Sequence, residues 1–471
     1  MNKTKIIATI GPASSSKGML KELIKAGMDV ARINLKHATR EFCIDVKSKI
    51  DELNYELNKN VALMFDTRGP ILRTGKFTNG SAIIQEKTKI RIYNRELIGD
   101  STKIFVDYPN LINEIKYDAI IKINDGKIKL QVIDKKEDCL ICEVLNGGEI
   151  SDNKAVNVVN HKLKTAFLSA HDIEDIKLAN QLNIDFLSLS NISSYEDVEE
   201  VNDILINLGN DHLSLIAKIE NARAFEDIDN IIDNCDGIMI ARGDLGVEVE
   251  LERVPGIQKQ IIAKCLIDGK VSIVATEMMS SMQSSATPSR AEVSDVANAV
   301  LDGTDAVMLS GETTVGKYPV EVIMMVEKIL KQSEQDMDYY EFNDKARRTE
   351  EKSITGNLAN NVCISAHDLK CKAIFAPTIS GHTPRKISRY RPFCPIIAGT
   401  SNEKVAKSLQ LHFGVFPVLI NELKTFDRII DASKKISKDF IKMEKNDKII
   451  VTGGYPFKDI KYTNFMKIEE Y

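Results

Sequence analysis

The sequence predicts an α/β protein: a closed (β/α)8 barrel, with a small all-β domain inserted in it and an α/β domain after it. Eight short apolar runs are each followed by an amphipathic helical segment, which is typical of a parallel sheet covered by helices. Eight such units favour closure into a TIM barrel over the alternative, a doubly wound open sheet. The length of 471 residues also exceeds what one hydrophobic core usually supports.

Three strand and helix units come first in the chain. The runs KIIATIG, VARIN and VALMFDT alternate with helical segments at KGMLKELIKAG and from Arg40 to Leu57. Five more units follow an interruption, with the apolar runs FLSLS, LSLIAKIE, GIMIARGD, SIVATEMM and AVMLSGET. Their predicted helices span 195–206, 225–232, 254–267, 290–301 and 320–332. We therefore assign residues 1–70 and 161–335 to the barrel.

The interruption, residues 71–160, predicts a small β-barrel lid domain. The runs KIRIYN, KIFVDY, AIIKIN, IKLQVID and CLICEVL are alternating or apolar, and turn signals at 124–126 and 146–148 separate some of them. A polar, helix-rich stretch then leads to KAIFAPT, CPIIAGT, FGVFPVLI and KIIVTGG, which are separated by helical segments. We assign residues 336–471 to a C-terminal α/β domain with a regulatory or oligomerisation role.

The amino-acid composition does not favour nucleic acid or a membrane as the binding partner. There are 63 Lys and Arg against 68 Asp and Glu, and no basic block favours nucleic acid or a membrane. The N-terminal apolar run is too short for a signal peptide, and no apolar span reaches 18 residues, so we expect a cytoplasmic protein. Eight scattered cysteines agree with a reducing compartment, and the single Cys139–Cys142 spacing does not favour a metal site.

Polar side chains gather where the predicted barrel strands end. In (β/α)8 barrels these ends converge on one rim, which carries the chemistry. The residues at these ends are Arg32, Asn34, Asp66, Thr67, Arg68, Arg73, Ser190, Lys218, Glu220, Arg242, Gly243, Asp244, Thr276, Glu277, Ser310 and Glu312. One charged residue after a strand is usually a solvated loop residue, but so many on one rim indicate a site.

Two neighbouring strands supply a candidate metal site. Lys218 and Glu220 are two residues apart on one strand and so face the same way, and Asp244 is expected to close the next strand. Two carboxylates with room for water and substrate oxygens are typical of a magnesium site. The alternative is a salt bridge at the rim. Gly243 would let backbone N–H groups approach an anion closely.

Several motifs together resemble pyruvate kinase. They are TIGPASS, AGMDVARIN, FDTRGP, NGGEI, AKIEN, IMIARGDLGVE, ATEMM, residues 289–321 and SRYRP, in unbroken order along the chain. The resemblance implies glycolytic transfer of a phosphoryl group from phosphoenolpyruvate to ADP, which gives pyruvate and ATP. It also implies a magnesium ion, a homotetramer and allosteric control.

The resemblance also implies roles for individual residues. Glu220 and Asp244 match the magnesium ligands, and Lys218, Arg32 and Thr276 match catalytic residues. Gly243 and Asp244 match backbone donors to the substrate carboxylate, beside substrate contacts from Arg32, Lys218 and Thr276. The implied nucleotide-binding residues are Arg32, Asn34, His37, Arg73 and His171.

The strand end ARINLKHA departs from the family at its monovalent cation site. Asn34, Asp66 and the Thr67 carbonyl match potassium ligands, but Lys36 stands where the family has serine, and Ile71 replaces a charged residue. Our hypothesis is that the Lys36 ammonium replaces potassium and pairs with Asp66. The alternative is that Lys36 points to solvent and the site is lost. These residues are therefore compatible both with dependence on potassium and with independence of it.

Other departures keep alternative functions open. His171 stands where the family often has lysine, residues 190–193 read SNIS instead of SFVR, and Glu277 stands where glutamine is common. These changes affect the nucleotide side of the site more than the magnesium carboxylates. An active pyruvate kinase is favoured, a weakly active paralogue with a binding or regulatory role is second, and another metal-dependent barrel enzyme such as an aldolase or lyase is third.

The C-terminal stretch PTISGHTPRKISRYRP resembles a loop that holds an effector phosphate. Its candidate effector residues are Thr378, Ser380, Gly381 and Thr383, and a helix N-cap is the simpler alternative. The family's glycine-rich second loop is replaced by GGYPFKDIKYTN, so a sugar monophosphate or AMP is favoured over fructose 1,6-bisphosphate.

Overall fold

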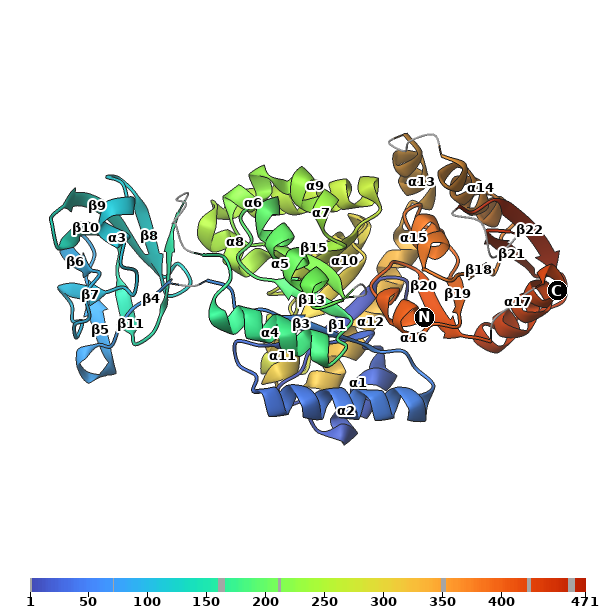
Figure 1. The fold of residues 1–471 in the computed structure, drawn as a ribbon, viewed down its shortest axis with the longest axis horizontal. Helices are drawn as coiled ribbons and strands as arrows, with labels where there is room; N and C mark the ends of the chain where they lie inside the picture. The colour runs from blue at the N-terminus through green and yellow to red at the C-terminus, as the bar shows by residue number, and fades with distance from the viewer. Residues whose placement is uncertain are drawn as a thin grey trace.

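The computed structural model describes residues 2–70, 72–159, 166–210, 213–348, 353–421, 425–455 and 462–471. Figure 1 shows three bodies in a row, with the barrel between the inserted β domain and the C-terminal domain. Of the expectations above, Ile71 and half of the stretch GGYPFKDIKYTN lie outside the described residues.

The barrel is closed and parallel, so the predicted fold is confirmed. Strand β1 pairs with β17 at one side and with β2 at the other, and the order around the barrel is β1-β17-β16-β15-β14-β13-β3-β2. The interior is filled by apolar side chains such as Ile7, Met64 and Phe186. The strands are β1 (Lys5–Thr9), β2 (Val30–Asn34), β3 (Ala62–Asp66), β13 (Phe186–Leu189), β14 (Ser214–Ile219), β15 (Gly237–Ala241), β16 (Val271–Ala275) and β17 (Ala306–Leu309).

Helices cover the outside of the barrel, and their ends follow local capping signals. Thr39 caps α2, and Ser289 with Glu292 forms a capping box on α10. The helices are α1 (Lys17–Ala26), α2 (Arg40–Leu57), α4 (Ala170–Gln181), α5 (Tyr195–Asn207), α6 (Ala222–Glu226), α7 (Ile228–Asn234), α8 (Arg242–Glu248), α9 (Val254–Asp268), α10 (Arg290–Leu301), α11 (Gly311–Thr314) and α12 (Pro319–Asp336).

The helix predicted over 225–232 is wrong as one element, because it breaks at Asp227 into α6 and α7. The Asp227 carboxylate accepts hydrogen bonds from the Tyr195 backbone N–H, at 2.8 Å, and from the Asn230 side chain, at 2.6 Å. A tertiary contact to α5 therefore accompanies the interruption, which periodicity alone does not reveal.

The inserted domain has a seven-stranded sheet in the order β4-β12-β8-β9-β10-β6-β7 and a two-stranded sheet of β11 and β5. Strands β8 and β12 alternate buried and partly exposed residues, so one face packs on the domain's core. The elements are β4 (Leu72–Arg73), β5 (Ser81–Ile84), β6 (Lys89–Tyr93), β7 (Lys103–Phe105), α3 (Leu111–Glu114), β8 (Ile120–Ile123), β9 (Ile128–Lys135), β10 (Cys139–Asn146), β11 (Gly148–Ser151) and β12 (Ala155–Val158).

The C-terminal domain has a five-stranded sheet in the order β20-β19-β18-β21-β22, in which only β22 runs antiparallel. Arg391 forms an ion pair with Asp305 of the barrel, at 2.9 Å, and both side chains are buried. The elements are α13 (Tyr339–Arg348), α14 (Ile354–Asp368), β18 (Ala373–Pro377), α15 (His382–Ser388), β19 (Ile396–Thr400), α16 (Glu403–Ser408), β20 (Val415–Leu419), α17 (Phe426–Phe440), β21 (Lys448–Gly453) and β22 (Phe465–Glu470).

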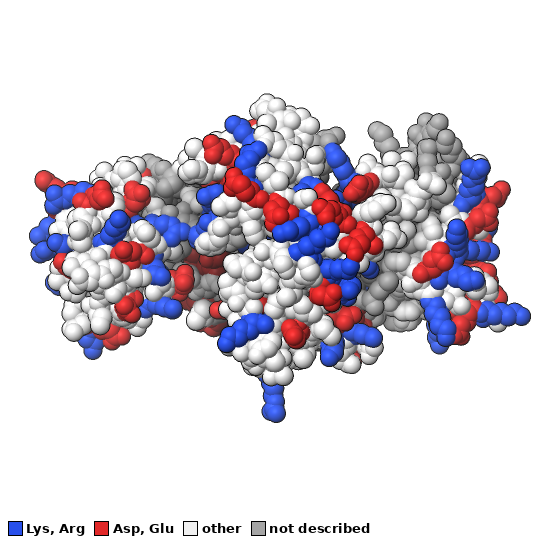
Figure 2. Space-filling model, turned by 90° about the horizontal axis from the view of Figure 1, so that it is seen from below, with Lys and Arg blue, Asp and Glu red and all other residues white. Residues whose placement is uncertain are grey.

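The distribution of charge on the surface and the burial of the cysteines agree with what the amino-acid composition predicts. Acidic and basic side chains are interspersed over the face shown in Figure 2. All eight cysteines are free and buried. No helix in the described ranges has the length and apolar character to cross a membrane.

Candidate active site

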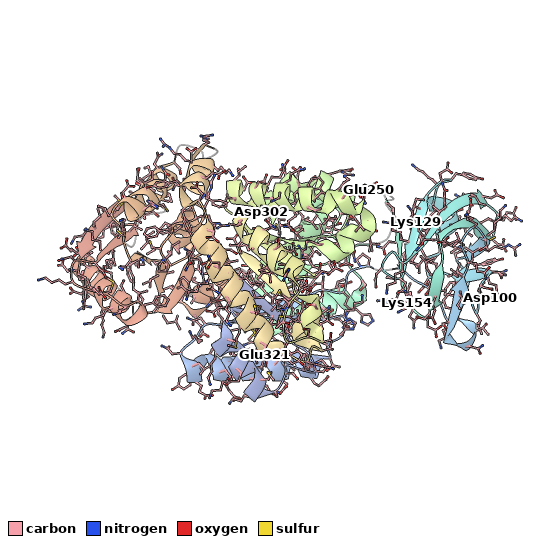
Figure 3. All side chains as sticks on the ribbon, turned by 180° about the vertical axis from the view of Figure 1, so that it is seen from behind. Asp100, Lys129, Lys154, Glu250, Asp302 and Glu321 are labelled. Atoms are coloured by element: carbon pink, nitrogen blue, oxygen red, sulfur yellow. The ribbon has the colours of Figure 1, made fainter. Side chains whose placement is uncertain are left out.

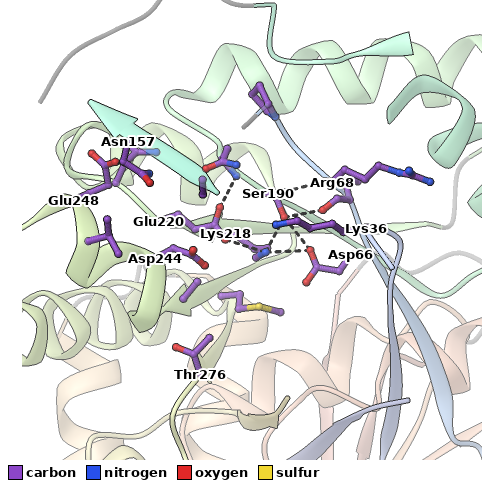
Figure 4. Close-up of a pocket in the computed structure, with 18 of the residues that line it drawn as sticks. Lys36, Asp66, Arg68, Asn157, Ser190, Lys218, Glu220, Asp244, Glu248 and Thr276 are labelled. Atoms are coloured by element: carbon purple, nitrogen blue, oxygen red, sulfur yellow. Dashed lines mark hydrogen bonds and ion pairs between the residues drawn. The ribbon is translucent and has the colours of Figure 1, made fainter. Parts of the chain in front are cut away.

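A cavity of about 420 Å³ opens at the carboxyl ends of the barrel strands, between the barrel and the inserted β domain. It brings together residues that are far apart in sequence, as Figure 4 shows for ten of them. The sequence-predicted residues that line it are Arg32, Asn34, Lys36, Asp66, Thr67, Arg68, Ser190, Lys218, Glu220, Asp244, Thr276 and Ser310.

A buried charge network forms one wall of the cavity. Arg32 donates to Asp66 through Nε at 2.8 Å and through a second guanidinium nitrogen. Lys218 Nζ donates to the other Asp66 oxygen at 3.1 Å and to Ser190 Oγ at 2.7 Å. Burial disfavours an ionised Asp66, but the charges of Arg32 and Lys218 outweigh it and lower its pKa to about 2. These contacts therefore hold the side chains of Arg32 and Lys218 in place at this wall of the cavity.

Glu220 and Asp244, the predicted carboxylate pair, both line this cavity. Lys218 Nζ lies 2.9 Å from one Glu220 oxygen, and the Asn191 backbone N–H donates to the other at 2.6 Å. Burial, together with the nearby Asp244 charge, raises the pKa of Glu220. A divalent cation bound beside these two carboxylates would offset the effect of burial and of the Asp244 charge on Glu220.

The geometry around Asp244 differs from the expectation in two ways. Strand β15 ends at Ala241, so Asp244 lies in the first turn of α8 and does not close a strand. The Gly243 N–H donates to Thr276 Oγ1 at 2.8 Å, so it is already engaged in this structure. Thr276 has a φ of 68°, which is strained for a β-branched residue and turns this hydroxyl toward α8.

The expected ion pair between Lys36 and Asp66 is wrong. Both Asp66 oxygens already accept hydrogen bonds from Arg32, Lys218 and Ser190. Lys36 is exposed but lines the cavity, and its backbone N–H donates to Asn34 Oδ1 at 3.1 Å. Although much of the side chain is exposed, the cavity walls partly desolvate the Lys36 ammonium, and this desolvation, with the charge of Arg73, lowers the pKa of Lys36.

Comparison with known proteins decides the family. A family model described as the pyruvate kinase barrel domain matches residues 1–323, and one described as the pyruvate kinase alpha/beta domain matches residues 357–469. The chain belongs to the pyruvate kinase family. It is therefore a phosphotransferase by kinship.

Full-length relatives agree with this family. The pyruvate kinase of Geobacillus stearothermophilus is 40% identical over 468 residues, covering 99% of this chain and 80% of that protein. The pyruvate kinase of Clostridium perfringens is 38% identical over 476 residues and is covered in full. A crystal structure of a pyruvate kinase from Cryptosporidium parvum has a TM-score of 0.95 and 33% identity, and covers 100% of this chain and 96% of its own.

Some residues implied by the pyruvate kinase resemblance lie beside the cavity and not in its lining. His37 is exposed next to Lys36, and Arg73 is on β4, where it donates to the Asn153 carbonyl at 2.8 Å. His171 is in the first turn of α4, with 75% of its side chain exposed and 3.9 Å from Glu174. The structure does not bring His171 into the cavity.

The candidate effector loop lies between β18 and α15. Gly381 stands at the N-cap of α15 without a side-chain cap, so the simple N-cap interpretation of Ser380 or Thr383 is wrong. Thr378 Oγ1 accepts the Gly381 N–H at 2.9 Å, and Thr383 Oγ1 lies 2.8 Å from Thr463 Oγ1. Ser380 is exposed. An effector role stays a prediction.

Sequence reasoning missed the wall that the inserted β domain contributes. Asn157 on β12 donates to Glu248 Oε1 on α8 at 2.9 Å, and both residues line the cavity. The alternation in AVNV places Asn157 on the face opposite Val156 and Val158, but it does not say what that face meets.

Proposed function

We propose that this enzyme transfers the phosphoryl group of phosphoenolpyruvate to ADP, with magnesium, and so acts as the pyruvate kinase of glycolysis. The observation that carries the proposal is the convergence of Lys218 and Arg32 with the carboxylates of Glu220 and Asp244 in one cavity. Phosphoryl transfer needs mainly positioning and neutralisation of charge, and these side chains supply both.

The donor set fits magnesium. In the described residues, no group of three or more histidine, cysteine or acidic side chains is arranged to hold a metal. Magnesium commonly takes one or two carboxylates and completes its shell with water and substrate oxygens. Glu220 and Asp244 would hold the ion, which would supply neutralising charge at the transferred group.

The residues of the chain have separate tasks in this proposal. Lys218 and Arg32 face the phosphoryl group, and because Asp66 and Ser190 already fix them, they need no reorganisation during the reaction. Thr276 lines the same cavity and lies below Lys218 in the view of Figure 4, and we place the enolpyruvate on that side. The β domain covers the mouth and limits access of water to the transferred group.

A coupled assay tests the proposal. Pyruvate formed from phosphoenolpyruvate and ADP is reduced by lactate dehydrogenase, with and without magnesium. We expect magnesium-dependent turnover. Binding of both substrates without turnover would support the weakly active paralogue, and keto-acid cleavage or condensation without ADP would support a barrel aldolase or lyase.

We further propose that the enzyme needs no potassium, because Lys36 places a cation at the cavity wall beside the site where the family's ion would bind. Support comes from Asn34 Oδ1 and the Asp66 oxygens, which already accept hydrogen bonds from protein donors. Turnover in sodium-free and potassium-free buffer should equal turnover with added potassium. The Lys36→Ser variant should become potassium-stimulated, whereas a potassium requirement in the unmodified enzyme would contradict this proposal.

Three further proposals follow from the family. We propose a cytoplasmic enzyme, in agreement with its eight free cysteines. Light scattering after size exclusion would test the proposed homotetramer. A thermal shift with sugar monophosphates and AMP, absent in a Ser380→Asp variant, would support the effector loop.

A further inference from the structure

The inserted β domain and the barrel meet at the C-terminal end of α8. Lys122 on β8 and Asn157 on β12 are direct cross-strand partners, so their side chains share one face of the sheet. Their neighbours Ile121, Ile123, Val156 and Val158 are buried in the domain's own core. The alternation of the two strands therefore turns Lys122 and Asn157 toward the barrel.

Both side chains end on the last turn of α8. Lys122 Nζ donates to the Val247 carbonyl, and Asn157 Nδ2 donates to Glu248 Oε1 at 2.9 Å. The last carbonyls of a helix have no partner inside the helix, so a lysine there satisfies one and faces the negative end of the helix dipole. The turn at Gly126 also approaches Val247, since a Cβ on Gly126 would lie 3.9 Å from Val247 Cγ1.

The opposite end of α8 is anchored in the barrel and carries the carboxylate of the proposed metal site. Arg242 donates to the Thr276 carbonyl at 2.7 Å and pairs with Asp295 at 2.7 Å. Asp244 follows in the first turn. With seven residues, α8 is about 10 Å long, and Glu248 and Asp244 are only about one turn apart, so a movement of the helix at Glu248 would also displace Asp244.

Glu248 is a partly buried carboxylate, and burial raises its pKa while Asn157 and Lys122 oppose that effect. If the β domain swung away, Glu248 would exchange its hydrogen bond from Asn157 for water, and the Val247 carbonyl would lose its donor Lys122. These contacts therefore exist only when the domain lies against α8.

We propose that Glu248, Asn157 and Lys122 form a latch that fixes the inserted β domain on α8 and thereby positions Asp244 for the metal. The inference rests on the proposed function, because it takes Asp244 as a magnesium ligand. All three residues act as positioning residues, since none needs to touch the reacting atoms. The apparent affinity for a ligand that requires the closed form is proportional to the fraction of protein that is closed, so loss of the latch should weaken its binding.

The test compares Asn157→Ala and Lys122→Met with a matched control, Lys129→Met. Lys129 is the cross-strand neighbour of Lys122 on β9 and is exposed, so the control removes a lysine from the same face of the sheet. Figure 3 shows Lys129 on the β-domain side of this junction and Glu250 on the barrel side.

Two measurements that do not need turnover report on the latch. Mn²⁺ binding to the protein alone is titrated by electron paramagnetic resonance, and the spread of the domains is measured by small-angle X-ray scattering. Each latch variant should weaken Mn²⁺ binding about fivefold to tenfold, the factor that corresponds to the net contribution of one ordinary intramolecular hydrogen bond. The radius of gyration of each latch variant should increase. The magnesium concentration that each variant needs for half-maximal activity should increase by a larger factor than that by which kcat decreases.

Glu248→Gln keeps an acceptor oxygen for Asn157 and should behave nearly as the unmodified enzyme, whereas Glu248→Leu should behave as Asn157→Ala. Unchanged thermal unfolding would show that the variants fold. If Asn157→Ala and Lys122→Met match Lys129→Met in Mn²⁺ binding and scattering, the latch is refuted. If the unmodified enzyme makes no pyruvate, the proposed function fails instead, whatever the variants show.

Discussion

Replacement of Lys218 by methionine tests the proposed mechanism most directly. Lys218 is 8% exposed, and its ammonium lies 3.1 Å from Asp66 Oδ1 and 2.9 Å from Glu220 Oε1. Two unit charges about 4 Å apart interact by about 4 kcal/mol at an effective dielectric constant near 20. If Lys218 meets the transferred phosphoryl group at that distance, its loss should lower kcat about 10³-fold, at about 1.4 kcal/mol for each factor of ten.

The variant should remain folded. Removing one partner of a buried ion pair costs about 3–5 kcal/mol. Here the cost should lie at the lower end, because Arg32 still pairs with Asp66 and the Asn191 N–H still donates to Glu220. Urea unfolding followed by circular dichroism measures this loss.

The assay is coupled pyruvate formation at saturating phosphoenolpyruvate, ADP and magnesium. Ser190→Ala is the control, because it removes a hydrogen bond of 2.7 Å to Lys218 but keeps the ammonium. We expect Ser190→Ala to lose less than about tenfold in kcat. A folded Lys218→Met enzyme within about tenfold of the unmodified kcat would refute the role of this charge.

Three stability predictions follow from individual environments. Burial raises the pKa of Asp185 to about 6. As the pH rises above about 4, this carboxyl ionises in the unfolded chain before it ionises in the folded protein. The free energy of unfolding therefore falls between pH 4 and 6. Asp185→Asn should therefore stabilise the protein by about 1–3 kcal/mol at pH 7.5 and hardly at pH 4, measured by urea unfolding; an equal effect at both values would contradict this. Ser289→Ala should cost about 1 kcal/mol in the same assay, through loss of the α10 cap. Gly316→Ala should lower Tm by several degrees in calorimetry, since its Cβ would lie 2.2 Å from the Glu312 carbonyl oxygen.

Local patterns predicted the elements that are stabilised locally or buried on both faces. The barrel strands are continuous apolar runs, and helices such as α2 and α10 carry their own caps, so their bounds agree with the sequence to within a residue or two. The strands β4, β5, β11, β12 and β22 were missed. The first four have only two to four residues, and runs of this length carry little signal of their own and depend on pairing with their neighbours. Strand β22 has six residues and likewise depends on pairing, with β21.

Strand ends and motifs are local, so the amino-acid sequence was enough to predict which residue types stand at the barrel rim. Which of them pair depends on how the strands are arranged around the barrel. The expected partner of Asp66 was Lys36, but β3 lies between β2 and β13 in the barrel, and side chains from these strands and β14 reach Asp66 first. The contact of Asn157 with Glu248 likewise depends on how two domains meet, and this is set by packing across more than 90 residues of sequence separation.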